Sequence, residues 1–468
     1  MSANESTSPI CHDSWRRLFD VEVIAAMLSE HPRAGEKLGA APYEVRVERY
    51  WPQGAPKVRG IQVEWSVRAR TGETSALFGQ QRLDGKPQRA RPPSEDTSRD
   101  PGHGNEPARG VFLRSADGRL LIHSPECDPI LSQLATCLNA EDMGPRLSAF
   151  GFHGRGATAG LHCRLAGYRA NRRAAIGYRF EPTQPLDPSL MGKTFRDSRG
   201  RELIQRHILV SEALRTVCGK RVRVPAPVGF DESLRLGVFF WMPGASLETV
   251  PHDGNRWMDA AVEAIGAIHE LKLSGLPCFT AEDEARIVRR WGHALEQVAP
   301  ELHTGVRTMI DRLLMRSGEI KTRHPRAIHR DFYDKQVVVD EGGVTVLDLD
   351  TLSLGDACVD LGNLLAHLYL KSLQHGESAG GFQSDAAAFL ERYESRCGRV
   401  DRGTLGFFTA SAFFRLGAVH SFRSHTQTFV PALWSAARAL TEGGPLGWEQ
   451  IGVPGKRSGQ DCCVRGAA

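Results

Sequence analysis

The stretch AIHRDFYDKQVVVD, residues 327–340, joins a polar, acidic segment to an apolar run of valines. Residues 341–343, EGG, separate it from VTVLDLD, residues 344–350. Glycine in a short connection between two β-branched runs predicts a β-hairpin. Such a hairpin would bring Gln336, at the start of the first strand, close to Asp348, at the end of the second.

Three oxygen-bearing side chains around this hairpin have the chemistry of a phosphate-handling site. Asp331 lies on the loop that enters the first strand, where it could accept the proton of a hydroxyl group or orient that group. Gln336 and Asp348 could together hold one magnesium ion, because this ion prefers hard oxygen ligands. The glutamine carbonyl suits that role, although its reach differs from that of asparagine by about 1.5 Å, one carbon–carbon bond.

The composition is that of an ordinary globular protein, with 41% apolar and 24% charged residues among 468. This length favours two or three lobes. A net charge of +4 is too weak to indicate nucleic acid or an anionic membrane as a partner. No apolar run approaches the ~18 residues of a membrane span. The polar start has no secretory signal, so we expect a cytoplasmic protein.

Ten cysteines are scattered along the chain without a C-x-x-C pair. This spacing predicts neither a zinc site nor a disulfide framework. Reduced thiols in a cytoplasm are the expected state.

Changes in composition divide the chain into five parts. Apolar–polar alternation indicates a β-containing accessory region over residues 1–83. Residues 84–110 hold almost no apolar side chains and predict a flexible linker, and the glycine-rich residues 443–468 predict a flexible tail. Short strand-like segments predict a β-rich N-lobe over residues 111–240, and helical spacing predicts a C-lobe over residues 241–442. The expected fold class is α+β, with two lobes and a cleft between them.

The sequence of the predicted hairpin and its flanking residues resembles that of a known family. HRDFYDKQ followed by VLDLDTLSLGDACVDLG is similar to the aminoglycoside phosphotransferase and choline kinase family of small-molecule kinases. That family's pattern is H-x-D-x-x-x-x-N, a hairpin, then I-D and, eight residues after that Asp, G-D-x-x-x-D. The chain departs from it by carrying Gln336 in place of the asparagine. The resemblance covers roughly residues 155–440 and implies a bilobal, protein-kinase-like fold.

The resemblance also implies roles for residues of the loop and hairpin. Asp331 would be the catalytic carboxylate, and Gln336 and Asp348 would be the magnesium ligands. Structural support would come from a buried loop histidine, an acid that opens the next helix and an acceptor that braces the catalytic loop, namely His329, Asp356 and Asp360.

Nucleotide-binding residues are expected further upstream. Lys193, in LMGKTFRD, resembles the family's phosphate-orienting lysine, which usually pairs with a helical glutamate. Glu212 is the preferred partner and Glu202 the alternative. Both lie in residues 199–217, whose helical spacing is set by Leu203, His207, Val210 and Leu214. The segment that joins the lobes would meet the adenine through the backbone of Phe240, Trp241 and Met242.

The position of the phosphate-binding loop stays open. The turn AGYRANRR, residues 166–173, has one glycine and three arginines, and arginine can bind phosphate. The run GFHGRGATAG, residues 151–160, is richer in glycine, which allows a close backbone approach to phosphates. Either segment could serve.

The expected function is ATP- and Mg²⁺-dependent transfer of the γ-phosphate to a hydroxyl of a small molecule, such as an aminoglycoside, an amino alcohol or a sugar-like acceptor. A nucleotide-binding module without turnover is the alternative, because of Gln336 and the glycine-poor turn. A protein kinase is disfavoured, because no D-F-G and no A-P-E segment follow the hairpin.

Overall fold

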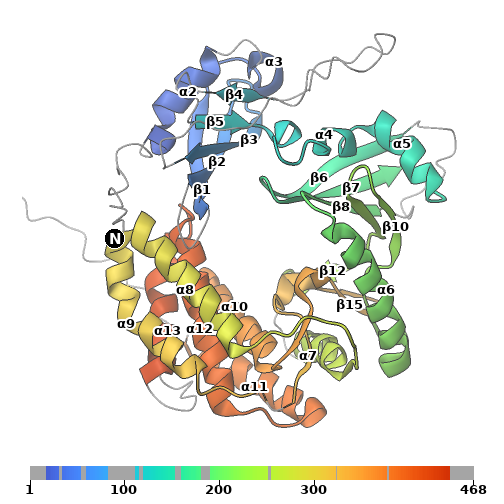
Figure 1. Ribbon diagram of the computed structural model, residues 1–468, viewed down its shortest axis with the longest axis vertical. Helices are drawn as coiled ribbons and strands as arrows, with labels where there is room; N and C mark the ends of the chain where they lie inside the picture. Colours follow the sequence, from blue (N-terminus) through green and yellow to red (C-terminus); the bar gives the residue numbers. More distant parts are fainter. Residues whose placement is uncertain are drawn as a thin grey trace, which may run out of the picture.

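The computed structural model describes residues 17–30, 34–53, 60–82, 111–114, 120–152, 160–180, 190–250, 255–322, 324–376 and 379–442. The predicted linker and tail lie outside these residues. The described residues form an N-terminal sheet, a second sheet with one long helix, and a helical part (Figure 1). The predicted bilobal α+β fold is confirmed, with the second sheet as N-lobe and the helical part as C-lobe. None of the described helices has the length and hydropathy needed to cross a bilayer.

The N-terminal sheet is antiparallel, with its strands in the order β1-β2-β3-β5-β4. Its core centres on the buried Trp65, whose indole N–H donates to the carbonyl oxygen of Leu18 at 3.1 Å. Gly79 lies under that ring, where an added Cβ would come within 2.0 Å of it. The elements are η1 (Arg17–Phe19), α2 (Val21–Ser29), α3 (Ala34–Leu38), β1 (Glu44–Gln53), β2 (Gly60–Arg68), β3 (Thr74–Arg82), β4 (Phe112–Arg114) and β5 (Leu120–His123).

The sheet topology corrects the predicted boundary between the accessory region and the N-lobe. The sequence placed residues from 111 onward in the N-lobe. Strands β4 and β5 instead complete the N-terminal sheet, and β5 pairs with β3 from Phe78↔His123 to Gln81↔Leu120. The reason is that all four residues of β5 are buried against this sheet.

The N-lobe is a second antiparallel sheet, with strands in the order β10-β11-β8-β7-β6, and α6 packs against it. The predicted inward face of α6 is confirmed, because Leu203, His207, Val210 and Leu214 are all buried. Tyr178 is buried in the sheet's core and donates its hydroxyl to the carbonyl oxygen of Cys137 at 3.0 Å. The elements are η2 (Pro125–Cys127), α4 (Leu134–Cys137), α5 (Ala140–Ala149), β6 (Leu161–Arg169), β7 (Arg173–Phe180), β8 (Leu190–Phe195), α6 (Arg199–Cys218), β10 (Pro227–Asp231) and β11 (Leu236–Phe240).

The C-lobe is mostly helical and has a large apolar core. Helices α10 and α12 approach closely at Gly362, where a Cβ would lie 2.7 Å from the backbone nitrogen of Thr409. Thr280 and Asp283 form a capping box at the start of α8. The helices are α7 (Asn255–Glu270), α8 (Ala281–Val298), α9 (Pro300–Ser317), α10 (Cys358–His375), α11 (Ala379–Cys397), α12 (Arg402–Ser421), η5 (Gln427–Phe429) and α13 (Val430–Glu442).

Short strands connect the two lobes around the predicted hairpin. That hairpin is present as β14 and β15, which pair from Val337↔Val346 to Asp340↔Gly343. One flanking strand, β9, runs parallel to β15, and another, β12, runs antiparallel to β14. The elements are β9 (Val222–Arg223), β12 (Ala245–Ser246), β13 (Arg326–Ile328), η3 (Asp334–Gln336), β14 (Val337–Asp340), β15 (Gly343–Val346), η4 (Leu349–Thr351) and β16 (Ser353–Gly355).

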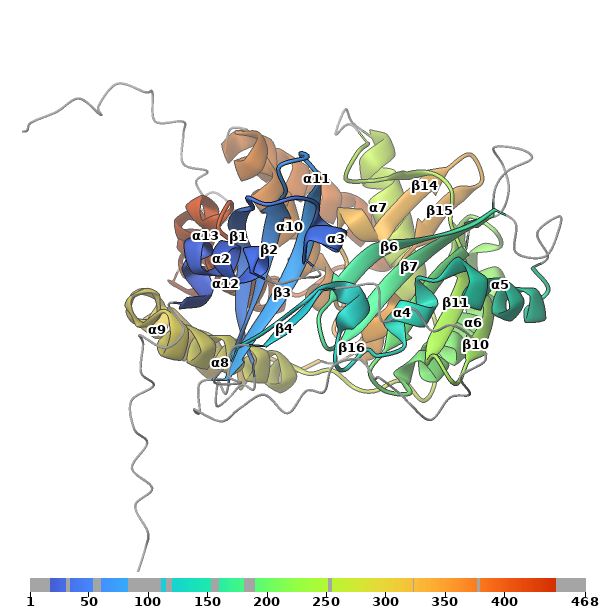
Figure 2. The same ribbon diagram turned by 90° about the horizontal axis from the view of Figure 1, so that it is seen from above.

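The N-terminal sheet contacts both lobes, and Figures 1 and 2 show β1 beside α12. On the C-lobe side, the backbone N–H of Tyr50 donates to the carbonyl oxygen of Phe422 at 2.9 Å, and their rings lie 5.2 Å apart. On the N-lobe side, the ring of Phe78 lies 4.6 Å from that of Tyr168. The accessory region therefore packs on both halves of the kinase-like core.

Candidate active site

The loop that carries Asp331 is held by one buried carboxylate. Asp360, fully buried on α10, accepts hydrogen bonds from the backbone N–H groups of His329 at 2.7 Å and Arg330 at 2.6 Å. Nε2 of His269 lies 3.0 Å from the same carboxylate. These bonds hold Arg330 at a φ of 69°, a left-handed conformation that L-residues seldom adopt. Asp360 thus fixes the backbone direction immediately before Asp331.

His329 ties this loop to the hairpin. Its buried ring places Nε2 2.7 Å from the carbonyl oxygen of Leu347 and Nδ1 3.3 Å from the backbone nitrogen of Asp331. One neutral tautomer satisfies both contacts, with the hydrogen on Nε2 and with Nδ1 accepting. Both ring nitrogens are then engaged, so the contacts of His329 are those of a brace and not of a base.

Asp331 itself lies at the end of this held segment and is half-buried. The next residue, Phe332, is fully buried, and Asn363 donates to its carbonyl oxygen at 3.0 Å. Among the described residues, no side chain donates a hydrogen bond to the Asp331 carboxylate. Its backbone is fixed while its acceptor atoms stay available for a substrate hydroxyl.

The hairpin brings Gln336 next to Asp348, as its sequence suggested. The backbone N–H of Leu347 donates to the carbonyl oxygen of Gln336 at 2.8 Å, so Asp348 follows directly. Asp348 adopts a left-handed backbone, with φ 55° and ψ 61°. Burial would raise the pKa of Asp348, but the charges of Lys193 and Arg173 outweigh it and lower that pKa to about 2. Asp348 is therefore a carboxylate at neutral pH.

Lys193 joins the lobes through two carboxylates. Its Nζ, on β8, lies 2.9 Å from Oδ1 of Asp348 and 3.0 Å from Oδ1 of Asp350. Arg173, on β7, also pairs with Asp350, and Arg206, on α6, donates to the carbonyl oxygens of Leu349 at 2.9 Å and Asp350 at 2.8 Å. Burial lowers the pKa of Lys193, and Asp348 opposes that effect. Three N-lobe cations thus hold the end of the hairpin.

The predicted glutamate partner of Lys193 is not among these groups. Glu212 is exposed on α6, and the structure describes no ion pair between it and Lys193. Glu202, the alternative, lines a pocket of about 220 Å³ together with Arg206 and Asp350. The residue that the sequence reasoning missed is Asp350. The signal was available in L-D-L-D, because two acids two positions apart at a strand end can share one side.

Asp356 lies where the next helix opens. Its Oδ1 accepts the backbone N–H of Cys358, the first residue of α10, at 3.0 Å. A side-chain oxygen at this position satisfies one of the otherwise unpaired N–H groups of the helix start. This contact orients α10, which carries Asp360.

The oxygen ligands at the hairpin could hold magnesium only together with phosphate oxygens of a nucleotide and with water. The described residues contain no group of three His, Cys, Asp or Glu side chains that could hold a metal ion. Asp348 and Gln336 supply one carboxylate and one amide, both hard oxygen ligands. Magnesium keeps several waters and binds through one or two carboxylates plus phosphate oxygens, so a two-residue set suits it.

A family comparison agrees with this geometry. Residues 196–396, which include the catalytic loop, the hairpin and Asp360, match the APH family, described as the phosphotransferase enzyme family. The predicted resemblance is confirmed, although β6, β7 and Lys193 precede the matched residues. No curated protein matches the chain.

Several solved structures are similar to the chain at low identity. Aminoglycoside phosphotransferase APH(4)-Ia is 15% identical over 61% of this chain and 94% of that chain, with a TM-score of 0.43. A choline/ethanolamine kinase family protein from Mesorhizobium loti is 14% identical over 64% and 92%, with a TM-score of 0.38. LicA, solved with AMP, is 13% identical over 64% and 96%, with a TM-score of 0.41.

The segment that joins the two lobes is open to solvent. Phe240 is 37% exposed and Trp241 is 49% exposed, and Met242 follows them between β11 and β12. The backbone N–H of Phe240 donates to the carbonyl oxygen of Ala226 at 2.9 Å. An adenine base would therefore have to use the backbone of Trp241 and Met242.

The arginine-bearing turn of the N-lobe is short, and a carboxylate outside the turn holds it. It spans only Ala170–Arg172 between β6 and β7, and Asn171 there has a φ of 61°. The buried Asp128 accepts the backbone N–H of Asn171 and the hydroxyl of Tyr168, both at 2.6 Å. The glycine-rich alternative falls largely on residues 153–159, outside the described residues.

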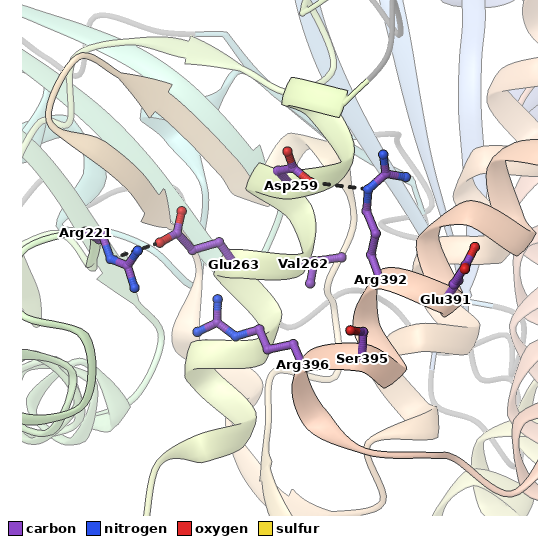
Figure 3. A pocket seen from close by; sticks show the side chains of 8 residues that line it. All are labelled: Arg221, Asp259, Val262, Glu263, Glu391, Arg392, Ser395 and Arg396. Carbon is purple, nitrogen blue, oxygen red and sulfur yellow. Dashed lines mark ion pairs between the residues drawn. The ribbon is translucent and has the colours of Figure 1, made fainter.

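A separate pocket of about 640 Å³ lies between α7 and α11 (Figure 3). Its charges pair with one another: Arg221 lies 3.4 Å from Glu263, and Arg392 lies 3.3 Å from Asp259. Glu391 also lines this surface. The pocket contains none of the loop or hairpin residues.

Proposed function

We propose that the chain is an ATP- and Mg²⁺-dependent phosphotransferase that transfers the γ-phosphate to a hydroxyl of a small molecule. The observation that carries this proposal is the 2.9 Å contact between Lys193 of the N-lobe and Asp348 of the C-lobe. This contact lies beside a loop that His329 and Asp360 hold rigid and that presents Asp331. Phosphoryl transfer depends mainly on such positioning and charge neutralisation.

Each residue has a role in the proposed step. The acceptor hydroxyl donates a hydrogen bond to Asp331 while its oxygen attacks the γ-phosphorus. The bond from that phosphorus to the bridging β,γ-oxygen breaks, ADP leaves, and the hydroxyl proton passes to Asp331. Lys193 orients the phosphates, and Asp348 and Gln336 are the residues that would hold magnesium. The metal would neutralise the charge of the phosphates.

We assign Asp350 as the positioning residue of Lys193. A nucleotide phosphate would attract Lys193, and a metal would attract Asp348. Together they would break the contact between Lys193 and Asp348. Asp350 would keep the ammonium group in place, since it lies 3.0 Å from Nζ and is itself held by Arg173. This carboxylate would replace the helical glutamate that the resemblance implied.

The test is ADP release from Mg-ATP over a panel of sugars, sugar acids, amino alcohols and aminoglycosides. We expect at least one acceptor to raise ADP release in the wild type. Asp331→Asn and Asp348→Ala should each lower that turnover by about 100-fold or more, because each removes a group that acts on the reacting atoms. Undiminished turnover in folded Asp348→Ala would refute the assignment.

A nucleotide-binding module without turnover is the second candidate. Gln336 stands at the metal position, and the turn at Ala170–Arg172 contains no glycine. Thermal stabilisation by ATP that does not depend on magnesium, without ADP formation on any acceptor, would favour this candidate. If Gln336→Asn gained turnover, the inactivity of the wild type would be due to the longer glutamine side chain.

The proposed reaction needs no nucleic acid or membrane. A cytoplasmic location fits the use of ATP and the seven described cysteines, which are all free thiols.

A further inference from the structure

The catalytic loop leads directly into a group of positive charges. Tyr333, two residues after Asp331, stacks on His367 with ring centroids 4.2 Å apart and planes 20° from parallel. Burial raises the pKa of Tyr333 to about 12, with Asp331 and Asp348 adding to the rise and Arg169 opposing it. The Tyr333 phenol therefore lies in the field of both the catalytic carboxylate and an N-lobe arginine.

The N-terminal sheet adds arginine to the same region. Arg49 of β1 and Arg423, just past the end of α12, are partners in an antiparallel β-bridge. The backbone N–H of Ser424 donates to the carbonyl oxygen of Glu48 at 3.2 Å, next to the Tyr50–Phe422 contact. These backbone bonds fix positions 49 and 423 side by side, one from the accessory region and one from the C-lobe.

Two of these arginines have no acidic partner. Arg49 pairs with Glu64, and its guanidinium carbon lies 5.4 Å from the ring centre of Trp51. Within the described parts of the chain, neither Arg423 nor Arg169 forms an ion pair. Arg169, on β6, is the cross-strand partner of Arg173, whose guanidinium lies 3.6 Å from Asp348. Burial lowers the pKa of the half-buried Arg423, the charges of Arg49 and Arg169 lower it further, and Tyr333 and Glu64 raise it. A partly buried cation without an ion pair, such as Arg423, is costly, and such groups are found where a ligand supplies the opposite charge.

Basic side chains of the C-lobe lie behind Tyr333. Burial lowers the pKa of His367 to about 3, and Arg415, His420, Lys335 and Arg423 lower it further. Acids of the C-lobe are occupied by basic partners. Glu284 lies 3.0 Å from Arg415, and Asp334 lies 3.2 Å from Lys371. A polycation would find no unpaired acids of this kind to bind.

We propose that Arg423, Arg169 and Arg49 form an anion-binding subsite beside Asp331, so that the acceptor is a hydroxyl compound carrying a carboxylate or a phosphate group. This inference rests on the proposed phosphotransferase function and narrows its acceptor class. Guanidinium groups bind carboxylates and phosphates through paired, charge-assisted hydrogen bonds. The subsite would disfavour aminoglycosides and choline-like amines, whose positive charge it repels.

The first experiment compares acceptors that differ in charge but share a hydroxyl framework. ADP release by the full chain is measured with gluconate, glucose 6-phosphate, glucose and glucosamine, and in parallel with glycerate, glycerol 3-phosphate, glycerol and ethanolamine. We expect anionic members to exceed their neutral and cationic counterparts by at least about tenfold in kcat/KM. Comparison of the carboxylate acceptors with the phosphate acceptors then shows which anion the subsite prefers. Turnover confined to cationic or neutral acceptors would overturn the subsite and leave the phosphotransferase function standing.

The second experiment separates anion binding from turnover. Inorganic phosphate is titrated in a thermal-shift assay with Mg-ADP at saturation, so that the nucleotide site is filled. We expect stabilisation of the wild type that Arg423→Gln and Arg169→Gln each weaken by about tenfold in apparent affinity. Arg307→Gln, an exposed position on α9, is the matched control and should bind like the wild type.

Arg169 is exposed, so Arg169→Gln should fold even if Arg423→Gln loosens the contact between the N-terminal sheet and the C-lobe. Equal phosphate binding by Arg169→Gln and the wild type would overturn the inference. If no acceptor supports ADP release while phosphate binding still depends on Arg169, the phosphotransferase proposal fails and the anion site remains.

Discussion

At the scale of single residues, Asp350 has the clearest expected effect. It lies 3.0 Å from Nζ of Lys193 and pairs with Arg173, whereas the exposed Glu212 does neither. Asp350→Asn neutralises a carboxylate that makes charge-assisted contacts with both Lys193 and Arg173, each worth about 1.5–3 kcal/mol. We expect kcat/KM for ATP to fall by about tenfold or more, mainly through a higher KM, because Asp331 is untouched.

The matched variant for this prediction is Glu212→Gln, which should behave like the wild type. Asp350→Glu, which keeps the charge, should recover part of the loss. A fall in kcat with unchanged KM for ATP in Asp350→Asn would argue against a role in holding Lys193.

At the scale of elements, Asp360 links α10 to the catalytic loop. Its buried carboxylate accepts two backbone N–H groups and contacts His269, so Asp360→Ala leaves these donors unpaired in the core. We expect the free energy of unfolding to fall by about 3 kcal/mol, measured by urea denaturation. Turnover should fall as well, since the bonds to Asp360 hold the backbone of Arg330 in its left-handed conformation.

Asp356→Ala is the comparison for this prediction. The half-buried Asp356 accepts one N–H at the start of α10, and the loss of such a cap costs about 1 kcal/mol. Equal destabilisation by both variants would mean that Asp360 does not brace the loop.

The same scale shows where sequence reasoning succeeds and where it fails. The EGG turn and its valine strands are local, so the hairpin and the nearness of Gln336 to Asp348 could be predicted. The helical spacing of α6 also placed Val210 and Leu214 on the inward face. Glu212 lies two residues from each of them. Because two residues span about 200° of an α-helix, Glu212 is on nearly the opposite side and faces outward. The preference for Glu212 over Glu202 rests on its deeper place in the helix and goes against this signal, and Glu212 is exposed in the structure.

Across the whole molecule, the missed features depend on contacts between distant residues. The return of β4 and β5 to the first sheet follows a segment with no apolar pattern, and alternation alone does not reveal a strand's partner. The partner of Lys193 is likewise more than 150 residues away in sequence. Local sequence patterns predict the helices, the strands and the loop that carries Asp331. The contacts between the lobes and the accessory sheet are seen only in the three-dimensional structure.

The contact of the accessory sheet with the C-lobe yields a prediction at this largest scale. Tyr50 packs between Phe19 and Phe422, with ring centroids 4.9 and 5.2 Å away, so Tyr50→Ala removes the apolar part of the interface. We expect faster amide hydrogen exchange at residues 421–424 and in β1, with α10 unchanged, because the loss opens the interface without unfolding the C-lobe. The control is Trp51→Ala, since successive side chains of a strand point to opposite faces. If Trp51→Ala accelerates exchange at residues 421–424 as much as Tyr50→Ala, general loosening of β1 and not the ring contact holds the sheet on the C-lobe.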